Sequence, residues 1–141
     1  MKTSRCILLV DDSPNDHFLA DEAVRHGKMD FKLCHANSGK DCLEHLRAAN
    51  KHPDVVLLDL RMPDMDGFQV LMELAGDPVL QDIPVLILSS SGNPEDVRLA
   101  YELGCKSYIM KPIDFNQFIQ VLTTLSSYWL KTVMLPHHLR R

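Results

Sequence analysis

The residues Val55-Val56-Leu57-Leu58-Asp59 give the clearest indication of the fold, because an uninterrupted apolar run ends there in a carboxylate. Two similar runs, Ile7-Leu8-Leu9-Val10 and Val85-Leu86-Ile87-Leu88, occur elsewhere in the chain. Apolar runs without polar alternation are typical of strands that helices cover on both faces. We therefore expect all three runs to be central strands of a parallel sheet.

Each run is followed by a helix start and an amphipathic stretch, which is the β-α alternation of a parallel sheet. The expected starts combine a capping side chain with a proline, or with a glutamine three residues later. They are Ser13-Pro14, Asn93-Pro94, Asp66 with Gln69, and Asp114 with Gln117. Gly27 and Gly104 stand where helices are expected to end.

Two weaker runs complete the expected sheet. Residues 31–36 alternate and Tyr108-Ile109-Met110 is short, which suits strands at or near the edges. The last helix is expected to turn an apolar stripe toward the sheet, made of Phe115, Phe118, Ile119, Leu122, Leu125 and Trp129. The whole pattern predicts an α/β fold in which helices flank five parallel strands.

Length and composition favour one ordinary globular domain. The chain has 141 residues, of which 45% are hydrophobic and 24% charged. Its formal net charge is −4, with 15 Lys+Arg against 19 Asp+Glu, which argues against direct DNA or RNA binding. The longest apolar run, residues 6–10, is far too short to span a bilayer. The four cysteines form no C-x-x-C pair, so we expect reduced thiols and a cytoplasmic protein.

Residues 1–130 are expected to form this domain and residues 131–141 a short tail, with no separate output domain. Residues 129–136 are too apolar to lie in water. They predict either a homodimer contact or a segment that folds back over the last helix. None of the seven histidines has a catalytic partner at a fixed spacing, and no function is predicted for them.

Polar side chains stand at four expected strand ends: Asp11-Asp12, Asp59, Ser89 and Lys111-Pro112. Ligands of open parallel sheets bind beyond the carboxyl ends of the strands, so we expect these side chains to meet. Three carboxylates brought together raise one another's pKa unless a cation shares the site. Oxygen ligands without His or Cys favour a hard ion, and Mg²⁺ is the expected metal.

A carboxylate at such a place is also a candidate nucleophile toward phosphorus. The charge on a transferred phosphoryl group must then be neutralised from several sides. Asp59 fits the nucleophile, while Lys111 and Ser89 fit the ammonium and hydroxyl donors.

Taken together, these residues resemble the receiver domain of two-component response regulators. The resemblance rests on Asp11-Asp12, on Asp59 and the residues up to Gly67, on Ser89 and on residues 108–112, and it spans about Cys6 to Ser127. It implies a flavodoxin-like, doubly wound sheet with strand order 2-1-3-4-5, as in the standalone chemotaxis regulators. Residues 85–97 and 128–130 are most similar to the single-domain regulators associated with phytochromes.

The resemblance implies a role for each acidic residue. Asp59 would accept a phosphoryl group from a sensor histidine kinase, for example a phytochrome-like one, or relay it to a histidine phosphotransfer protein. Asp11, Asp12 and Asp59 would hold Mg²⁺ with the backbone carbonyl of Arg61. Lys111 would pair with the phosphoryl group, and its peptide bond to Pro112 would be cis.

The remaining roles concern switching. Ser89 would draw its loop inward on phosphorylation, and Tyr108 would follow as the reporter of the active state. Arg61 and Ser91 stand at positions that set the lifetime of the phosphate. The implied protein is a signalling switch and not an enzyme, because it catalyses only its own phosphorylation and dephosphorylation.

Two other classes of function are open at this point. A phosphatase with an aspartyl-phosphate intermediate, as in the haloacid dehalogenases, needs a general acid two residues after its nucleophile, where this chain has Arg61. A receiver-like adaptor that is never phosphorylated would leave the strand-end acids without a cation to offset their repulsion.

Overall fold

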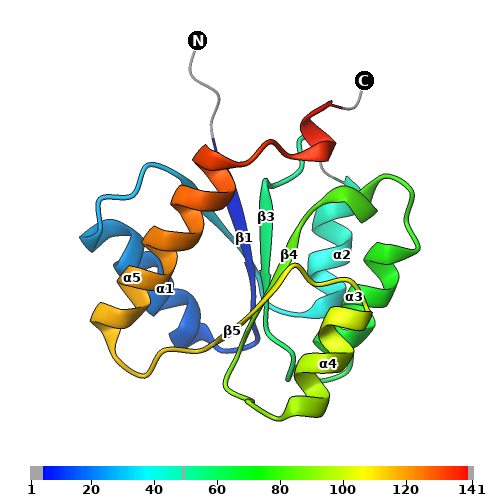
Figure 1. Ribbon diagram of the computed structural model, residues 1–141, viewed down its shortest axis with the longest axis horizontal. Coiled ribbons are helices and arrows are strands. Elements are labelled where there is room, and N and C mark those ends of the chain that lie inside the picture. The colour runs from blue at the N-terminus through cyan, green and yellow to red at the C-terminus, as the bar shows by residue number, and fades with distance from the viewer. Residues whose placement is uncertain (1–4, 49, 140–141) are drawn as a thin grey trace.

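The computed structural model describes residues 5–48 and 50–139, which form one open parallel sheet between two layers of helices (Figure 1). The strands are β1 (Cys6–Val10), β2 (Lys32–Ala36), β3 (Val55–Leu58), β4 (Val85–Ser89) and β5 (Ser107–Met110). Their order is β2-β1-β3-β4-β5, and every neighbouring pair is parallel. The predicted fold class and strand order are therefore confirmed.

The helices divide between the two faces of the sheet. They are α1 (Pro14–His26), α2 (Gly39–Ala48), α3 (Gly67–Ala75), α4 (Pro94–Glu102) and α5 (Phe115–Ser126), with a short 3-10 turn, η1 (Leu80–Asp82), before β4. Figure 1 shows α1 and α5 side by side on one face and α2, α3 and α4 on the other. Each face thus has its own helical cover, as the unbroken apolar runs require.

The central strands feed two separate apolar cores. In β1, Ile7 and Leu9 pack with α1 and α5, whereas Leu8 and Val10 pack with the opposite helices. Side chains of a strand alternate between its faces, so an all-apolar strand is needed to supply both cores. This is the physical reason for the sequence pattern in β1, β3 and β4.

The helix ends largely follow the predicted signals. Ser13 and Asn93 each cap a helix that begins with proline, and Asp66 forms the predicted reciprocal capping box with Gln69. Asp114 also caps its helix, but its carboxylate accepts the amide of Asn116, so the predicted pairing with Gln117 is wrong. A single side-chain cap is sufficient to start α5.

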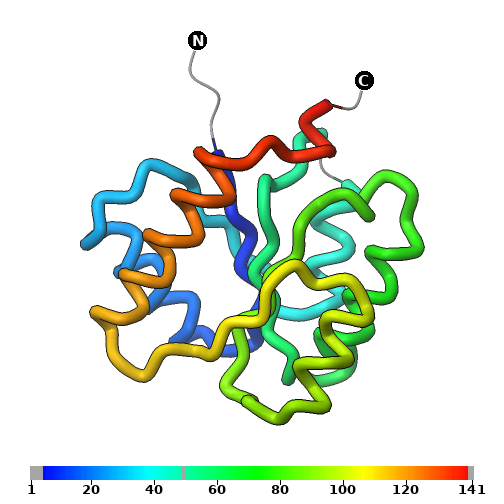
Figure 2. The backbone as a smooth tube through the Cα atoms, in the orientation of Figure 1, coloured from blue at the N-terminus to red at the C-terminus, as the bar shows by residue number. Residues whose placement is uncertain are grey.

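The last helix is shorter than its apolar stripe. It ends at Ser126 and continues as a π-helical turn, η2 (Ser127–Thr132), and after a short link as a 3-10 turn, η3 (Pro136–Leu139). Leu130 and Leu135 are buried, and Figure 2 shows this segment running across the edge of the sheet where the strands begin. The tail therefore folds back on the domain, as one alternative predicted, but over the sheet edge and not over α5.

None of the helices in the described part of the chain is long and apolar enough to cross a membrane.

Candidate functional site

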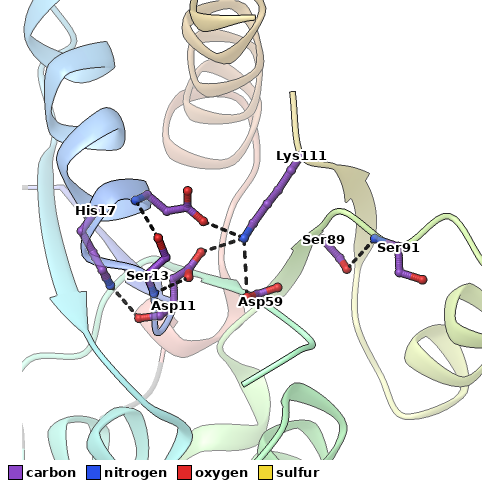
Figure 3. A network of polar contacts seen from close by, with 8 residues as sticks. Asp11, Ser13, His17, Asp59, Ser89, Ser91 and Lys111 are labelled. Atoms are coloured by element: carbon purple, nitrogen blue, oxygen red, sulfur yellow. Dashed lines mark hydrogen bonds and ion pairs between the residues drawn. The ribbon is translucent and has the colours of Figure 1, made fainter. Parts of the chain in front are cut away.

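The candidate site lies at the carboxyl edge of the sheet, opposite the edge that the tail covers (Figures 1 and 3). Val10 pairs with Leu58 in neighbouring strands, so the residues that follow them, Asp11 and Asp59, emerge together. The amide of Asp59 donates to the carbonyl of Val10 at 3.0 Å. The parallel register thus brings two acids together that are far apart in the sequence.

Lys111 joins these acids from the end of β5. Its Nζ lies 3.0 Å from Oδ2 of Asp11 and 3.5 Å from Oδ2 of Asp59 (Figure 3). A third carboxylate, that of Asp16, accepts from the same ammonium at 2.8 Å. The side chains predicted from the strand ends do meet, and one ammonium is shared among three acids.

Asp16 was not among the predicted site residues. It lies in the first turn of α1, where its amide donates to the Ser13 hydroxyl. An acid in a first turn is the usual complement of the helix dipole, so the sequence offers no signal that sets it apart. A buried histidine also supports this loop, because Nε2 of His17 lies 2.8 Å from the backbone carbonyl of Asp11.

Burial in this site shifts the pKa of the carboxyl groups. Burial raises the pKa of Asp11 to about 6, even though hydrogen bonding from Ser13 and Lys111 opposes the shift. Burial also raises the pKa of Asp59, against the lowering effect of Lys111 and of the Arg61 backbone amide. Burial alone would lower the pKa of Lys111, but its hydrogen bonds to Asp16 and Asp11 raise it overall. The single ammonium of Lys111 therefore does not fully offset the negative charge of the carboxylates around it.

This donor set fits a hard divalent cation. Carboxylate oxygens of Asp11, Asp12 and Asp59 all lie within 4.8 Å of one another. Asp12 is exposed, while Asp11 and Asp59 are buried, so the group faces solvent on one side. Oxygen ligands with room for water are the ligands that Mg²⁺ prefers. The Arg61 backbone faces the same place, since its amide hydrogen-bonds to the Asp59 carboxylate.

The loop after β3 approaches the site closely. The amide of Gly67 donates to the carbonyl of Leu60 at 2.9 Å, and a side chain at this position would collide with the Asp59 carbonyl oxygen. Asp64, in the same loop, has a φ of 66°. The loop is thus folded tightly against the residue that ends β3.

Ser89 ends β4 beside these acids, as predicted. It is fully buried, and its Oγ accepts the amide of Ser91 at 3.1 Å (Figure 3). The hydroxyl of Ser91 donates to Oδ2 of Asp96 at 2.8 Å, and the guanidinium of Arg61 pairs with the same oxygen. The two predicted lifetime residues, Arg61 and Ser91, therefore share a partner on α4 that the sequence did not indicate.

Tyr108 is half-buried and connects β5 to the loop after β4. Its hydroxyl donates to the backbone carbonyl of Ser91 at 2.7 Å, and its amide donates to the hydroxyl of Tyr101 at 3.1 Å. The ring thus contacts the loop that begins at Ser89.

The peptide between Lys111 and Pro112 is trans, so the predicted cis bond is wrong, and the described residues contain no cis peptide. The amide of Lys111 still reaches the carbonyl of Ser89 at 2.8 Å, which positions its side chain without a cis bond.

The fold and the shared ammonium among strand-end acids define a receiver-type regulatory domain. The sequence matches the response regulator receiver domain family over residues 7–123, and the chain belongs to this family. The receiver-domain relatives of this chain are signalling proteins.

Individual relatives show which kind of response regulator this chain resembles. Response regulator Rcp1 of Synechocystis sp. is 34% identical over 137 residues, which are 94% of this chain and 93% of Rcp1. The structure of the phosphorylated cyanobacterial phytochrome response regulator RcpA is 34% identical, covers 95% of this chain and 99% of that one, and has a TM-score of 0.87. The Mn²⁺-bound form of Rcp1, also 34% identical, covers 94% and 99% with a TM-score of 0.81. The chain is thus a response regulator related to phytochrome-associated regulators.

Proposed function

We propose that Asp59 accepts a phosphoryl group from a histidine kinase and that the resulting change of charge switches the binding of partners. The observation that carries this proposal is the shared ammonium, with Lys111 Nζ 3.5 Å from Asp59 and 3.0 Å from Asp11. An ammonium beside a buried carboxylate stabilises both that carboxylate and the charge that a phosphoryl group brings.

The reaction assigns one task to each side chain. An Asp59 oxygen attacks phosphorus of a phosphohistidine, the phosphorus–nitrogen bond breaks, and the imidazole leaves with the bonding pair and takes up a proton. Lys111 neutralises the phosphoryl oxygens, and the buried Ser89 hydroxyl is the proposed donor to one of them. Asp11, Asp12, Asp59 and the Arg61 carbonyl would hold Mg²⁺, which supplies further positive charge to the phosphoryl oxygens.

Phosphorylation by acetyl phosphate, followed by intact mass, tests this proposal. We expect one phosphoryl adduct that requires Mg²⁺ and is absent from Asp59→Asn. Asp64→Asn is the matched control, because Asp64 lies in the same loop with a φ of 66°, which asparagine tolerates. An adduct that persists in Asp59→Asn overturns the assignment of the acceptor. No adduct on the unchanged chain with Mg²⁺ present favours the adaptor function instead.

The proposed switch runs through the loop after β4. To donate to a phosphoryl oxygen, the Ser89 hydroxyl has to move toward Asp59, and the Ser91 amide that donates to the same hydroxyl oxygen is drawn with it. Tyr108 follows, because its own hydroxyl donates to the Ser91 carbonyl. We expect Ser89→Ala to be phosphorylated still, but to lose the phosphorylation-dependent change in the NMR signals of the Tyr108 ring. A change that survives in Ser89→Ala contradicts this route.

The proposed lifetime control runs through Asp96. This carboxylate holds both Arg61 and Ser91 in the unphosphorylated protein. Asp96→Ala releases the Arg61 guanidinium to shield the phosphoryl group from water, so we expect a longer-lived adduct. The effect should disappear when Arg61→Ala is added; equal lifetimes in all three proteins contradict the proposal.

The relatives and the sequence together support several finer proposals about the donor, the place of action and the output. Because RcpA is named as a phytochrome response regulator, we propose a phytochrome-like histidine kinase as the phosphoryl donor. We propose that the domain, residues 1–130 with a short tail of residues 131–141, acts in the cytoplasm without binding DNA or membranes itself. Its signal would leave through a partner, a homodimer or phosphorelay to a histidine phosphotransfer protein. Sedimentation of the chain with and without phosphorylation tests the dimer, which two equal monomeric values would exclude.

A further inference from the structure

A second group of metal-ligating side chains lies at the opposite edge of the sheet from Asp59. Asp54 precedes β3, while His137 and His138 belong to η3 in the tail. One ligand atom from each of these residues lies within 4.8 Å of the other two. The tail histidine and the loop before β3 come together although His137 and Pro53 are 84 residues apart in the sequence.

Asp54 is held so that one of its oxygens faces the histidines. The carboxylate is buried, and its Oδ2 accepts the backbone amide of Cys6 at 2.8 Å. Oδ1 is the atom that contacts the tail, with Nε2 of His138 at 2.5 Å. A carboxylate fixed by a backbone amide keeps its second oxygen in a defined position, as ligating carboxylates usually do.

His137 is oriented in the same manner. Its Nε2 lies 3.1 Å from the carbonyl of Pro53, which can only accept, so this nitrogen carries the proton. Nδ1 is then left with its lone pair, and it is buried without a hydrogen-bond partner among the described residues. A histidine that donates one ring N–H to a backbone carbonyl while the other nitrogen is free has the arrangement typical of a metal ligand.

We propose that Asp54 Oδ1, His137 Nδ1 and His138 Nε2 bind a zinc-class divalent cation. Two imidazole nitrogens and one carboxylate oxygen suit Zn²⁺ or Co²⁺, whereas Mg²⁺ prefers oxygen ligands alone. Three protein ligands leave a tetrahedral ion one position for water. The bound cation replaces the contact between His138 and Asp54 and ties the tail to the amino edge of the sheet, away from the phosphorylation site.

Calorimetric titration of the full chain with Zn²⁺ tests the proposal, with excess Mg²⁺ present to occupy the strand-end acids. We expect one zinc site per chain, weakened at least about tenfold in His137→Gln and in His138→Gln, since loss of even an outer partner costs this much. His45→Gln, at an exposed position of α2, is the matched control and should bind as the unchanged chain does. Zinc should also raise the melting temperature of the unchanged chain and of His45→Gln, but of neither tail variant.

Two thiol groups near the proposed site are alternative zinc ligands. Sγ of Cys6 lies 3.0 Å from Sγ of Cys34, and thiols also bind zinc. Cys34→Ser should therefore keep the site, and Co²⁺ should give no sulfur-to-cobalt charge-transfer band. Zinc binding that is lost in Cys34→Ser, or that is unchanged in both tail variants, overturns the proposal. Acetyl phosphate labelling of His138→Gln should be normal, so this test is independent of the function proposed for Asp59.

Discussion

Lys111 balances the charge of three acids, so its removal exposes their repulsion. The ammonium lies within 3.5 Å of Asp11, Asp16 and Asp59. We expect Lys111→Met to lower the free energy of unfolding by about 2 kcal/mol in a metal-free buffer, because uncompensated buried charge is costly. Mg²⁺ should restore part of this loss, since a divalent cation replaces the missing charge. Urea unfolding with EDTA and with Mg²⁺ measures both effects; equal losses in the two buffers would contradict this account.

The raised pKa of Asp11 gives the metal-free protein a defined pH dependence. The pKa is about 6 in the fold against an ordinary value of 3.8 for an aspartate, so the folded state binds this proton more tightly. The stability due to this proton is complete below the unfolded value and is lost as the pH rises through about 6. Asp11→Asn mimics the protonated form. Its free energy of unfolding should therefore equal that of the unchanged chain at a pH near 3.8 and exceed it at a pH above about 6. The expected difference is about 3 kcal/mol.

Urea unfolding of both proteins across this pH range in EDTA checks that prediction. Mg²⁺ should reverse the order above the higher pKa, because only the unchanged chain keeps the Asp11 carboxylate for the metal. A constant difference between the two proteins at every pH would show that burial of Asp11 is not the cause.

The residues that the sequence indicated are those at strand ends, because the end of a buried apolar run can be located without a structure. Asp59 follows Leu58 directly, and Ser89 closes β4. Asp16 and Asp96 could not be found in this way, since both lie in first turns of helices where acids are common. Their roles depend on where α1 and α4 lie relative to Lys111 and Arg61, which is a property of packing.

The junction of β3 and α3 leaves no room for a side chain at Gly67. A Cβ on Gly67 would lie 2.6 Å from the Asp59 carbonyl oxygen and 2.8 Å from the Leu60 Cα, and both are backbone atoms that cannot turn aside. We expect Gly67→Ala to destabilise the fold by about 1–3 kcal/mol, as overpacking does, and to slow phosphorylation because the Asp59 backbone must shift.

Gly76→Ala is the control for this prediction. Gly76 caps the other end of the same helix with a φ of −84°, and its nearest neighbour for a Cβ is the Met72 carbonyl oxygen at 3.6 Å. This substitution should be neutral or stabilise by about 0.5 kcal/mol through the unfolded state. Similar unfolding midpoints for the two variants would mean that the close approach at Gly67 carries no cost.

The elements themselves were predictable to different degrees for one physical reason. β1, β3 and β4 are buried on both faces, so their whole sequence is constrained to be apolar. The end of α5 is not constrained in this way, because its apolar stripe continues into the π-helical turn without interruption. Periodicity alone therefore extended the helix to Trp129, three residues beyond its actual end at Ser126.

At the scale of the whole molecule, the sheet has two edges with different chemistry. The carboxyl edge gathers the acids around Lys111, while the amino edge is closed by the tail and holds the Asp54–His137–His138 group. The two groups share no residue, so a substitution in one removes no ligand or ion pair from the other. This separation is what permits the phosphorylation test and the zinc test to succeed or fail independently.

The tail contributes buried side chains to the domain. Leu135 is 4% exposed although it stands near the end of the chain, whereas its neighbour Met134 is 82% exposed. Leu135→Ala should lower the free energy of unfolding by about 2 kcal/mol, the lower end for a buried leucine, because a surface segment can partly collapse into the space. Met134→Ala should change it by less than about 0.5 kcal/mol. If both variants unfold like the unchanged chain at equal concentration, the tail does not pack on the sheet edge, and its apolar residues are then free to form the homodimer contact that the sequence also allows.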